Sequence, residues 1–190
     1  MILDLLRHGE TELGGGLRGS LDDALTDLGW AQMNAAVAQG GPWDVLLCSP
    51  LQRCARFADA LGERLGLPVE VSAGWRELHF GEWEGRSAAQ IMQTAPEALG
   101  QFWSDPYAYT PPGGEPVAAF AERVQQTLRT ARQQHAGQRV LLVTHGGVMR
   151  LLLAQARGLP RQQLLQVEVA NGALLRLDLG ALDQHAVGVH

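Results

Sequence analysis

The sequence predicts an α/β protein in which a mostly parallel sheet lies between two layers of helices, a three-layer α/β/α sandwich. Short apolar runs that are typical of buried strands alternate with longer segments whose apolar residues recur at helical spacing. Near the end of the chain, Asn171-Gly172 separates two apolar runs, which is typical of a tight hairpin turn. Because no linker-like stretch interrupts this pattern, we expect one domain over residues 1–190.

The first half of the chain predicts three strands and two helices. The strands are expected at short apolar runs, over residues 2–6, 44–48 and 67–71. A helical pattern begins at Thr26 and ends before Gly40-Gly41-Pro42. The inner face of this helix is expected to carry Leu28, Ala31, Ala35 and Ala38. Ser49-Pro50 is typical of an N-cap followed by a first-turn proline, so the second helix is expected to begin there.

The second half begins with an irregular stretch, residues 72–114, that is rich in Trp, Gly and Pro and has one or two short helices near residues 87–103. A long helix is expected from about Pro116 to His135. A buried strand follows at residues 139–144, and then a helix that is apolar almost all round at residues 148–156. The two strands of the predicted hairpin are residues 165–169 and 174–179.

The charge balance excludes one class of partner. Fifteen Lys and Arg residues against twenty Asp and Glu residues give a formal net charge of −5. Because no basic stripe exists to neutralise a phosphate backbone, we expect no nucleic-acid partner. An anionic ligand would have to be held by a local cluster of cations.

The sequence also gives expectations about the cellular compartment and about metals and cofactors. No apolar run approaches the roughly 20 residues of a membrane span, and no secretory signal is recognised, so we expect no membrane partner. The only cysteines, Cys48 and Cys54, are expected to be reduced thiols of a cytoplasmic protein. No two histidines are spaced i, i+4 on a predicted helix, so we expect no metal site, and nothing indicates a cofactor.

Three predicted strand ends carry reactive or basic residues. The first strand runs into Arg7-His8-Gly9, a second leads through Ser49 to Arg53, and a later one ends in Thr144-His145-Gly146. In open α/β sheets the ligand binds beyond the carboxyl ends of the strands, so neighbouring strands would bring these residues into one crevice. A single His-Gly pair could be an ordinary turn, and Arg53 could lie on a solvated helix face. Two such pairs in one chain favour a site.

This set of side chains suits the transfer of a phosphoryl group. The reaction needs neutralisation of negative charge, an in-line nucleophile and a proton for the leaving oxygen. A neutral imidazole such as His8 is a capable nucleophile near neutral pH, and arginines bind the non-bridging oxygens bidentately. His145 can donate to the same oxygens. The acid is expected to be a partly buried Glu or Asp, and spacing alone does not choose among the glutamates from Glu77 to Glu115.

Six segments resemble the motifs of the histidine phosphatase superfamily, the group that contains the phosphoglycerate mutases. The most specific is Leu6-Arg7-His8-Gly9-Glu10-Thr11. The others, in the same order, are Gly19-x-x-Asp22-x-x-Leu25-Thr26-x-x-Gly29, Ser49-Pro50-Leu51-Gln52-Arg53, Glu77-Leu78-His79-Phe80-Gly81-x-Trp83-Glu84-Gly85, Pro112-Gly113-Gly114-Glu115 and Thr144-His145-Gly146-Gly147. The resemblance spans nearly the whole chain and implies a phosphoglycerate mutase-like fold.

The resemblance also implies roles for individual residues. His8 would be the nucleophile that becomes phosphorylated, and Glu77 would be the proton donor. The phosphate pocket would be formed by Arg7, Arg53 and His145. Substrate contacts would come from Thr11, Gly19, Gly146 and Trp83. The implied enzyme is a metal-independent phosphomonoesterase that acts through a phosphohistidine intermediate on a small phosphorylated metabolite.

The loop after the first motif departs from the family pattern. Members commonly carry an Asn there that contacts phosphate, whereas this chain has Leu13-Gly14-Gly15-Gly16 and a shorter loop. Backbone N–H groups of the glycine run could replace the missing contact. Arg18 could also compensate, although we expect it to be an exposed loop residue.

Motif spacing favours a compact phosphatase over a mutase. Glu77 and His145 are only 68 positions apart, without the insertion that the mutases carry there. Chain length and the style of the Glu77 motif are most similar to members that remove the 5′-phosphate of α-ribazole, the nucleoside of the cobalamin lower ligand. Aromatic residues of the irregular stretch could stack on such a ring, or simply pack together. They are Trp75, Trp83, Phe102, Trp103, Tyr107 and Tyr109.

Two other functions stay open at this point. A phosphoglycerate mutase or a sugar-phosphate phosphatase would use the same residues. A non-catalytic protein that binds a phosphorylated ligand would keep the pocket without turnover, although the presence of all five expected catalytic residues argues against it. The oligomeric state is not indicated by the sequence.

Overall fold

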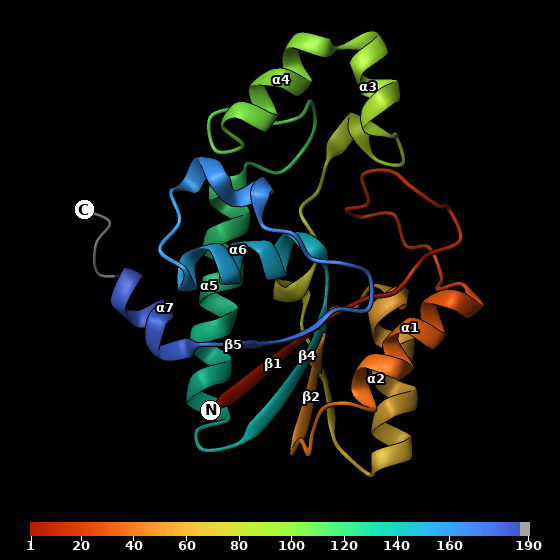
Figure 1. Ribbon diagram of the computed structural model, residues 1–190, viewed down its shortest axis with the longest axis vertical. Helices are drawn as coiled ribbons and strands as arrows, with labels where there is room; N and C mark the ends of the chain where they lie inside the picture. Colours follow the sequence, from red (N-terminus) through yellow and green to blue (C-terminus); the bar gives the residue numbers. More distant parts are fainter. Residues whose placement is uncertain (187–190) are drawn as a thin grey trace.

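The computed structural model describes residues 1–186 and is built around one five-stranded sheet (Figure 1). In spatial order the strands are β3 (Val69–Val71), β2 (Val45–Cys48), β4 (Arg139–Thr144), β1 (Ile2–Arg7) and β5 (Leu174–Leu177). The first four run parallel, and β5 pairs antiparallel with β1. The predicted mostly parallel sheet is confirmed.

Helices cover both faces of this sheet and form the outer layers of the predicted sandwich. The α-helices of the described residues are α1 (Asp27–Val37), α2 (Gln52–Leu65), α3 (Ala88–Thr94), α4 (Pro96–Ser104), α5 (Val117–Gln134), α6 (Gly146–Ala156) and α7 (Leu179–Ala186). Short 3₁₀ helices lie at Ala73–Trp75, Gly81–Trp83 and Arg161–Gln166. Figure 1 shows α1 and α2 on one side of the sheet, α5 and α6 on the other, and α3 with α4 apart at the top.

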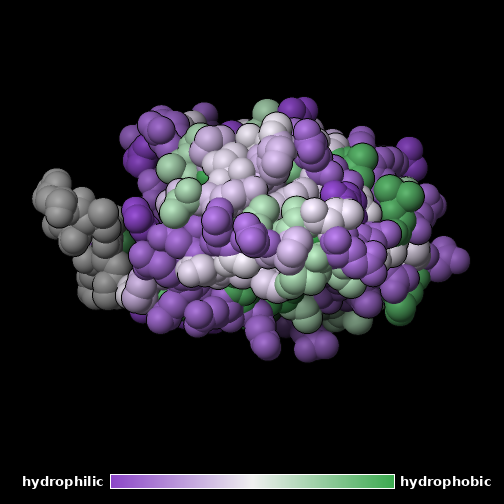
Figure 2. Space-filling view, turned by 90° about the horizontal axis from the view of Figure 1, so that it is seen from above, coloured by the Kyte–Doolittle hydropathy of each residue, from purple (hydrophilic) through white to green (hydrophobic). Residues whose placement is uncertain are grey.

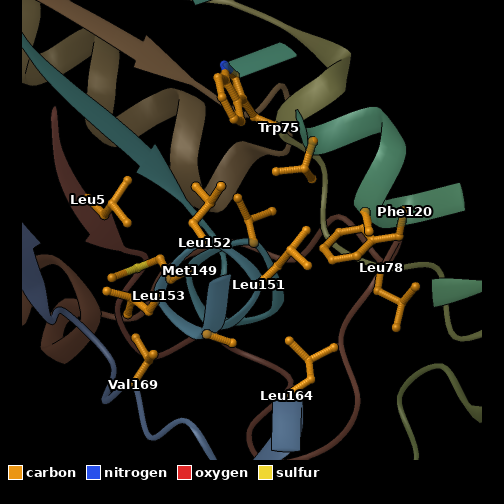
Figure 3. Close-up of a cluster of buried hydrophobic side chains, with 14 of the residues drawn as sticks. Leu5, Trp75, Leu78, Phe120, Met149, Leu151, Leu152, Leu153, Leu164 and Val169 are labelled. Carbon is orange, nitrogen blue, oxygen red and sulfur yellow. The ribbon is translucent and has the colours of Figure 1, made fainter. Parts of the chain in front are cut away.

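Side-chain alternation along β4 separates two hydrophobic clusters. Val140 and Leu142 belong to the cluster that contains α5 and α6, whereas Leu141 and Val143 belong to the cluster that contains α1 and α2. This follows because successive side chains of a strand point to opposite faces of the sheet. Figure 3 shows the first cluster, in which side chains of α6 pack beside Phe120 of α5.

The predicted hairpin around Asn171-Gly172 is wrong. The second of its runs forms β5, but the first forms no strand, because its side chains and carbonyls are used elsewhere. Val167 and Val169 are buried in the cluster with α6, and their backbone oxygens accept hydrogen bonds from the side chains of Arg150 and Arg7. β5 therefore pairs with β1 instead.

The inner face of α1 is also different from the predicted one. Gly29, Met33 and Val37 are buried, whereas Leu28 is 54% exposed. Alanine and other apolar residues occur around most of this helix, so their spacing does not distinguish the two faces. The inner face predicted for the long helix α5 is confirmed: Val117, Phe120, Val124, Leu128 and Ala131 are all buried.

The surface carries scattered rather than concentrated apolar residues. The large hydrophobic side chains that remain exposed are Ile2, Leu13, Leu28, Leu65, Val71, Met92 and Trp103. Figure 2 shows the top face as largely hydrophilic, with small hydrophobic areas between. Among the described helices, none combines the length and the apolar character that crossing a bilayer requires.

The corrected orientation of α1 predicts a contrast between two substitutions. Met33→Ala should lower the free energy of unfolding by about 2–5 kcal/mol, because it opens a cavity at a side chain with no exposed surface. Leu28→Ala should change it by about 0.5 kcal/mol or less, because that side chain is half exposed. Urea unfolding of the two variants measures both values. A larger loss for Leu28→Ala would contradict the orientation.

Candidate active site

Three strands deliver the candidate residues to one edge of the sheet. β4 lies between β1 and β2, with Thr144 opposite Arg7 and Val143 opposite Cys48. The residues that follow these strands therefore emerge side by side at their carboxyl ends, as expected for a ligand site in a parallel sheet. In Figure 1 the loop after β1 and the α3–α4 pair lie at this end of the molecule.

His8 is buried and uncharged. The Nδ1 atom of His8 lies 2.8 Å from the backbone oxygen of Gly9. A carbonyl only accepts, so Nδ1 carries the proton and Nε2 keeps its lone pair. Burial, followed by the charge of Arg53, lowers the pKa of His8 to about 3. The ring is therefore a neutral imidazole at physiological pH.

His145 packs edge-on against His8. The two ring centroids are 5.4 Å apart at an interplanar angle of 63°. The Nε2 atom of His145 lies 2.7 Å from the Ser49 hydroxyl, which fixes the ring. Burial, and then the charge of Arg53, lowers the pKa of His145 well below its usual value. The predicted helix start at Ser49-Pro50 is wrong: α2 begins at Gln52, after Leu51 as its N-cap residue, and has no side-chain cap.

Arg53 is a fully buried cation held by the loop that follows β1. Its Nη1 donates to the oxygen of Leu21 (2.5 Å), and its Nη2 donates to the oxygen of Gly19 (2.9 Å). Asp23 Oδ1 lies 3.5 Å from Nη1. The loop is itself held by Glu84, whose carboxylate accepts from backbone N–H groups of residues 19, 20, 21 and 80.

Arg7 lies beside a second guanidinium, that of Arg150. Nη1 of Arg7 donates to the oxygen of Val169, and Nε of Arg150 donates to the oxygen of Val167. Burial and the nearby Arg150 charge lower the pKa of Arg7. A Cβ on Gly146 would come within 3.0–3.3 Å of both guanidinium groups, so a residue without a side chain lets the two cations pack over the start of α6.

Both carboxyl oxygens of Glu77 accept hydrogen bonds from backbone N–H groups. Oε2 accepts from the N–H of Gly147 (2.8 Å), and Oε1 accepts from the N–H of Leu78 (2.9 Å). A Cβ on Gly147 would lie 2.1 Å from Oε1, so glycine is required for this approach. Glu77 is 9% exposed.

An ion pair between α5 and the residues just before it holds the backbone segment that carries Glu77. Arg123 pairs bidentately with Glu115, at 3.1 and 2.8 Å. The same guanidinium donates to the backbone oxygens of residues 74, 76 and 77. Sequence reasoning missed this clamp, as it missed the roles of Ser49, Glu84 and Gly147, because each acts on a partner distant in the chain.

The structure places the expected substrate-binding residues in different situations. Thr11 is buried, and its backbone pairs with Leu25. Gly19 uses its N–H on Glu84 and its oxygen on Arg53, so it positions the arginine rather than contacting a substrate through these groups. Gly146 begins α6 beside the two arginines.

Trp83, which the resemblance places in contact with the substrate, is buried among other aromatic side chains. Its side chain is 2% exposed, stacks on Tyr109 at 5.9 Å and meets the edge of Phe102 at 5.7 Å. No face of the indole is left for a ligand ring. Trp75 is likewise buried, whereas Trp103 on α4 is 49% exposed.

A small cavity of about 50 Å³ lies next to Glu77. It is bounded by Gly147, Arg150 and a largely apolar wall consisting of Leu78, Phe80, Phe102, Pro106, Val117, Phe120, Leu164 and Leu165. In the part of the chain that the structure describes, no three His, Cys, Asp or Glu side chains are grouped so that they could hold a metal ion.

Two imidazoles among buried arginines, with a carboxyl group beside them on a three-layer α/β fold, define a phosphatase of the histidine type. The chain belongs to the histidine phosphatase superfamily (branch 1), whose family model matches residues 3–188. It is accordingly a phosphoric monoester hydrolase with the predicted phosphoglycerate mutase-like fold.

The proteins to which the chain is similar include alpha-ribazole phosphatases and glucosyl-3-phosphoglycerate phosphatases. The Escherichia coli adenosylcobalamin/alpha-ribazole phosphatase is 30% identical over 200 residues, which cover 100% of this chain and 98% of that one. The glucosyl-3-phosphoglycerate phosphatase of Mycolicibacterium vanbaalenii is 36% identical over 170 residues, which cover 83% of this chain and 75% of that protein. The crystal structure of the alpha-ribazole phosphatase from Shigella flexneri has a TM-score of 0.81 at 30% identity. The match covers 94% of this chain and 90% of that chain.

The depressed pKa of His8 predicts that acid destabilises the folded protein. Between about pH 6.5 and the folded value of about 3, the unfolded chain takes up a proton that the folded protein excludes. Stability is therefore fully present above about pH 6.5 and is lost as the pH falls, by about 1.4 kcal/mol per pH unit for such a group. His8→Asn should flatten this dependence in urea unfolding at a series of pH values. Equal slopes for wild type and variant would contradict it.

Proposed function

We propose that the chain hydrolyses its phosphate ester in two steps through a phosphohistidine at His8. In the first step, Nε2 of His8 attacks phosphorus, a P–N bond forms, and the P–O bond to the leaving group breaks. Glu77 gives its proton to the leaving oxygen. In the second step, Glu77 accepts a proton from water, which attacks phosphorus, breaks the P–N bond and releases inorganic phosphate.

The supporting observation is a neutral, buried imidazole surrounded by buried cations. The Nδ1–H to Gly9 bond leaves the lone pair of His8 on Nε2. Arg7, Arg53 and His145 are placed in this proposal on the non-bridging oxygens, where preorganised donors stabilise the transition state without reorganisation. A non-catalytic binding role is disfavoured because such a role does not need a carboxyl group held beside the imidazoles.

The substrate that we propose is α-ribazole 5′-phosphate. The Escherichia coli relative with that activity in its name matches this chain over essentially the whole length of both. The wall beside Glu77 that the leaving group would face consists of aromatic and aliphatic side chains such as Phe80, Phe102 and Leu165. Such a wall suits an apolar ring better than a sugar, which needs hydrogen-bonding partners.

A second candidate is a phosphorylated sugar-acid substrate such as glucosyl-3-phosphoglycerate. It is favoured by the 36% identity to the Mycolicibacterium vanbaalenii protein and by Arg150, a cation at the edge of the same cavity that could pair with a carboxylate.

We further propose that the enzyme acts in the cytoplasm without a cofactor or a metal. Cys48 and Cys54 are buried free thiols, which are typical of reducing compartments. The partners in this proposal are small phosphorylated metabolites and not nucleic acids, because the net charge is −5.

A substrate panel tests this function. With α-ribazole 5′-phosphate, glucosyl-3-phosphoglycerate and 3-phosphoglycerate supplied separately, kcat/KM for phosphate release should be highest for α-ribazole 5′-phosphate and unchanged by excess EDTA. A higher value for glucosyl-3-phosphoglycerate would select the second candidate. Formation of 2-phosphoglycerate from the third compound would indicate a mutase, and loss of turnover in EDTA would contradict the metal-free mechanism.

The acid role of Glu77 predicts a dependence on the leaving group. Glu77→Gln should lower kcat/KM, which reports the first step alone, for alkyl phosphates by about 100-fold or more, because their alkoxides need a proton. The loss should be far smaller for 2,4-dinitrophenyl phosphate, whose leaving group departs as an anion. Glu82→Gln, at an exposed neighbouring position, serves as the control. Equal losses on both types of substrate would remove Glu77 from this role.

A further inference from the structure

Arg18 is buried, contrary to the exposed position expected from the sequence. Its side chain is 7% exposed. Its Nε lies 3.0 Å from Asp23 Oδ2, and its Nη2 donates to the backbone oxygen of Gly14. A glycine-rich loop offers little cover for a long cationic side chain, so this burial requires specific partners.

Arg18 and Arg53 share one carboxylate. Asp23, whose side chain is 2% exposed, places Oδ2 on Arg18 and Oδ1 on Arg53. The Asp23 charge also acts on His8, where it raises the pKa and so opposes the larger lowering by burial and Arg53. The backbone close to Arg18 also contacts Arg53. Arg53 donates to the carbonyl oxygens of Gly19 and Leu21.

Arg7, Arg18 and Arg53 each retain an unused donor. Within residues 1–186, the buried nitrogens without a hydrogen-bond partner include Nη1 of Arg18, Nε of Arg53 and Nε of Arg7. A buried donor left unpaired costs about 1–3 kcal/mol. Three such donors at one edge of a sheet indicate a site built for an anion that supplies the acceptors.

We propose that Arg18 is a third phosphate-binding arginine, oriented by Asp23 so that Nη1 donates to a non-bridging oxygen of the bound phosphoryl group. This rests on the proposed function, since it assigns another contact in the same site. Asp23 has a positioning role: it lets two guanidinium groups approach the same anion despite their mutual repulsion.

Direct binding of inorganic phosphate tests this assignment without requiring turnover. Isothermal titration calorimetry of the full chain gives Kd for wild type, Arg18→Met, Arg18→Gln and the control Arg129→Met. Arg129 is an exposed residue of α5, and its guanidinium donates to the side chain of Gln126. Both Arg18 variants should raise Kd by about 10- to 100-fold, as expected for the loss of one charge-assisted hydrogen bond, and Arg129→Met should leave it unchanged.

The two Arg18 variants separate binding from folding. Arg18→Gln places its amide nitrogen where Nε of Arg18 lies, so it keeps an N–H donor for Asp23 and preserves this contact of the loop if Arg18→Met unfolds. A folded variant of either kind that binds phosphate as wild type does would overturn the proposal. So would an unchanged phosphate Kd accompanied by a raised KM, because Arg18 would then contact the leaving group. If wild type binds phosphate but hydrolyses no ester, the proposed function fails while the assignment of Arg18 can still be tested.

Discussion

A guanidinium with no exposed surface, that of Arg53, organises the candidate site. A buried cation is tolerated only when hydrogen bonds and a counter-charge replace its hydration. For Arg53 these come from Gly19, Leu21 and Asp23, so the loop after β1 must fold over the first turn of α2. The carboxylate of Glu84 accepts hydrogen bonds from backbone N–H groups of the same loop. This contact connects the 3₁₀ segment near Trp83 to the site.

Burial and the positive field of Arg53 also set the charge state of the two histidines. Both lower the pKa of His8 and of His145, with burial the larger cause. The neutral ring is the reactive form, because a protonated imidazole has no lone pair to offer phosphorus. The same burial that weakens the fold in acid thus prepares the nucleophile. Confining the cations to one crevice lets a protein of net charge −5 attract an anion locally.

Patterns of neighbouring residues in the sequence predicted the elements that depend on local contacts. They failed where a contact with a residue distant in the chain determines the structure. The strand ends at His8 and His145 could be found because an apolar run stops abruptly at each. Ser49 was interpreted as a helix cap, since its true partner, His145, is 96 residues away. The hairpin failed because the carbonyl of Val169 accepts from an arginine of β1 and the carbonyl of Val167 accepts from an arginine of α6. Trp83 was assigned to the substrate because an aromatic pattern does not say what packs against it.

The most direct measurement follows the phosphorus atom itself. Wild-type enzyme is mixed with a ³²P-labelled phosphomonoester, quenched within the first turnover in alkali, and digested to locate the label. The account predicts an acid-labile, alkali-stable label on the peptide that contains His8, and none in His8→Ala, whose turnover should also be lost. Label on another residue, or wild-type turnover in His8→Ala, would contradict nucleophilic attack by this imidazole.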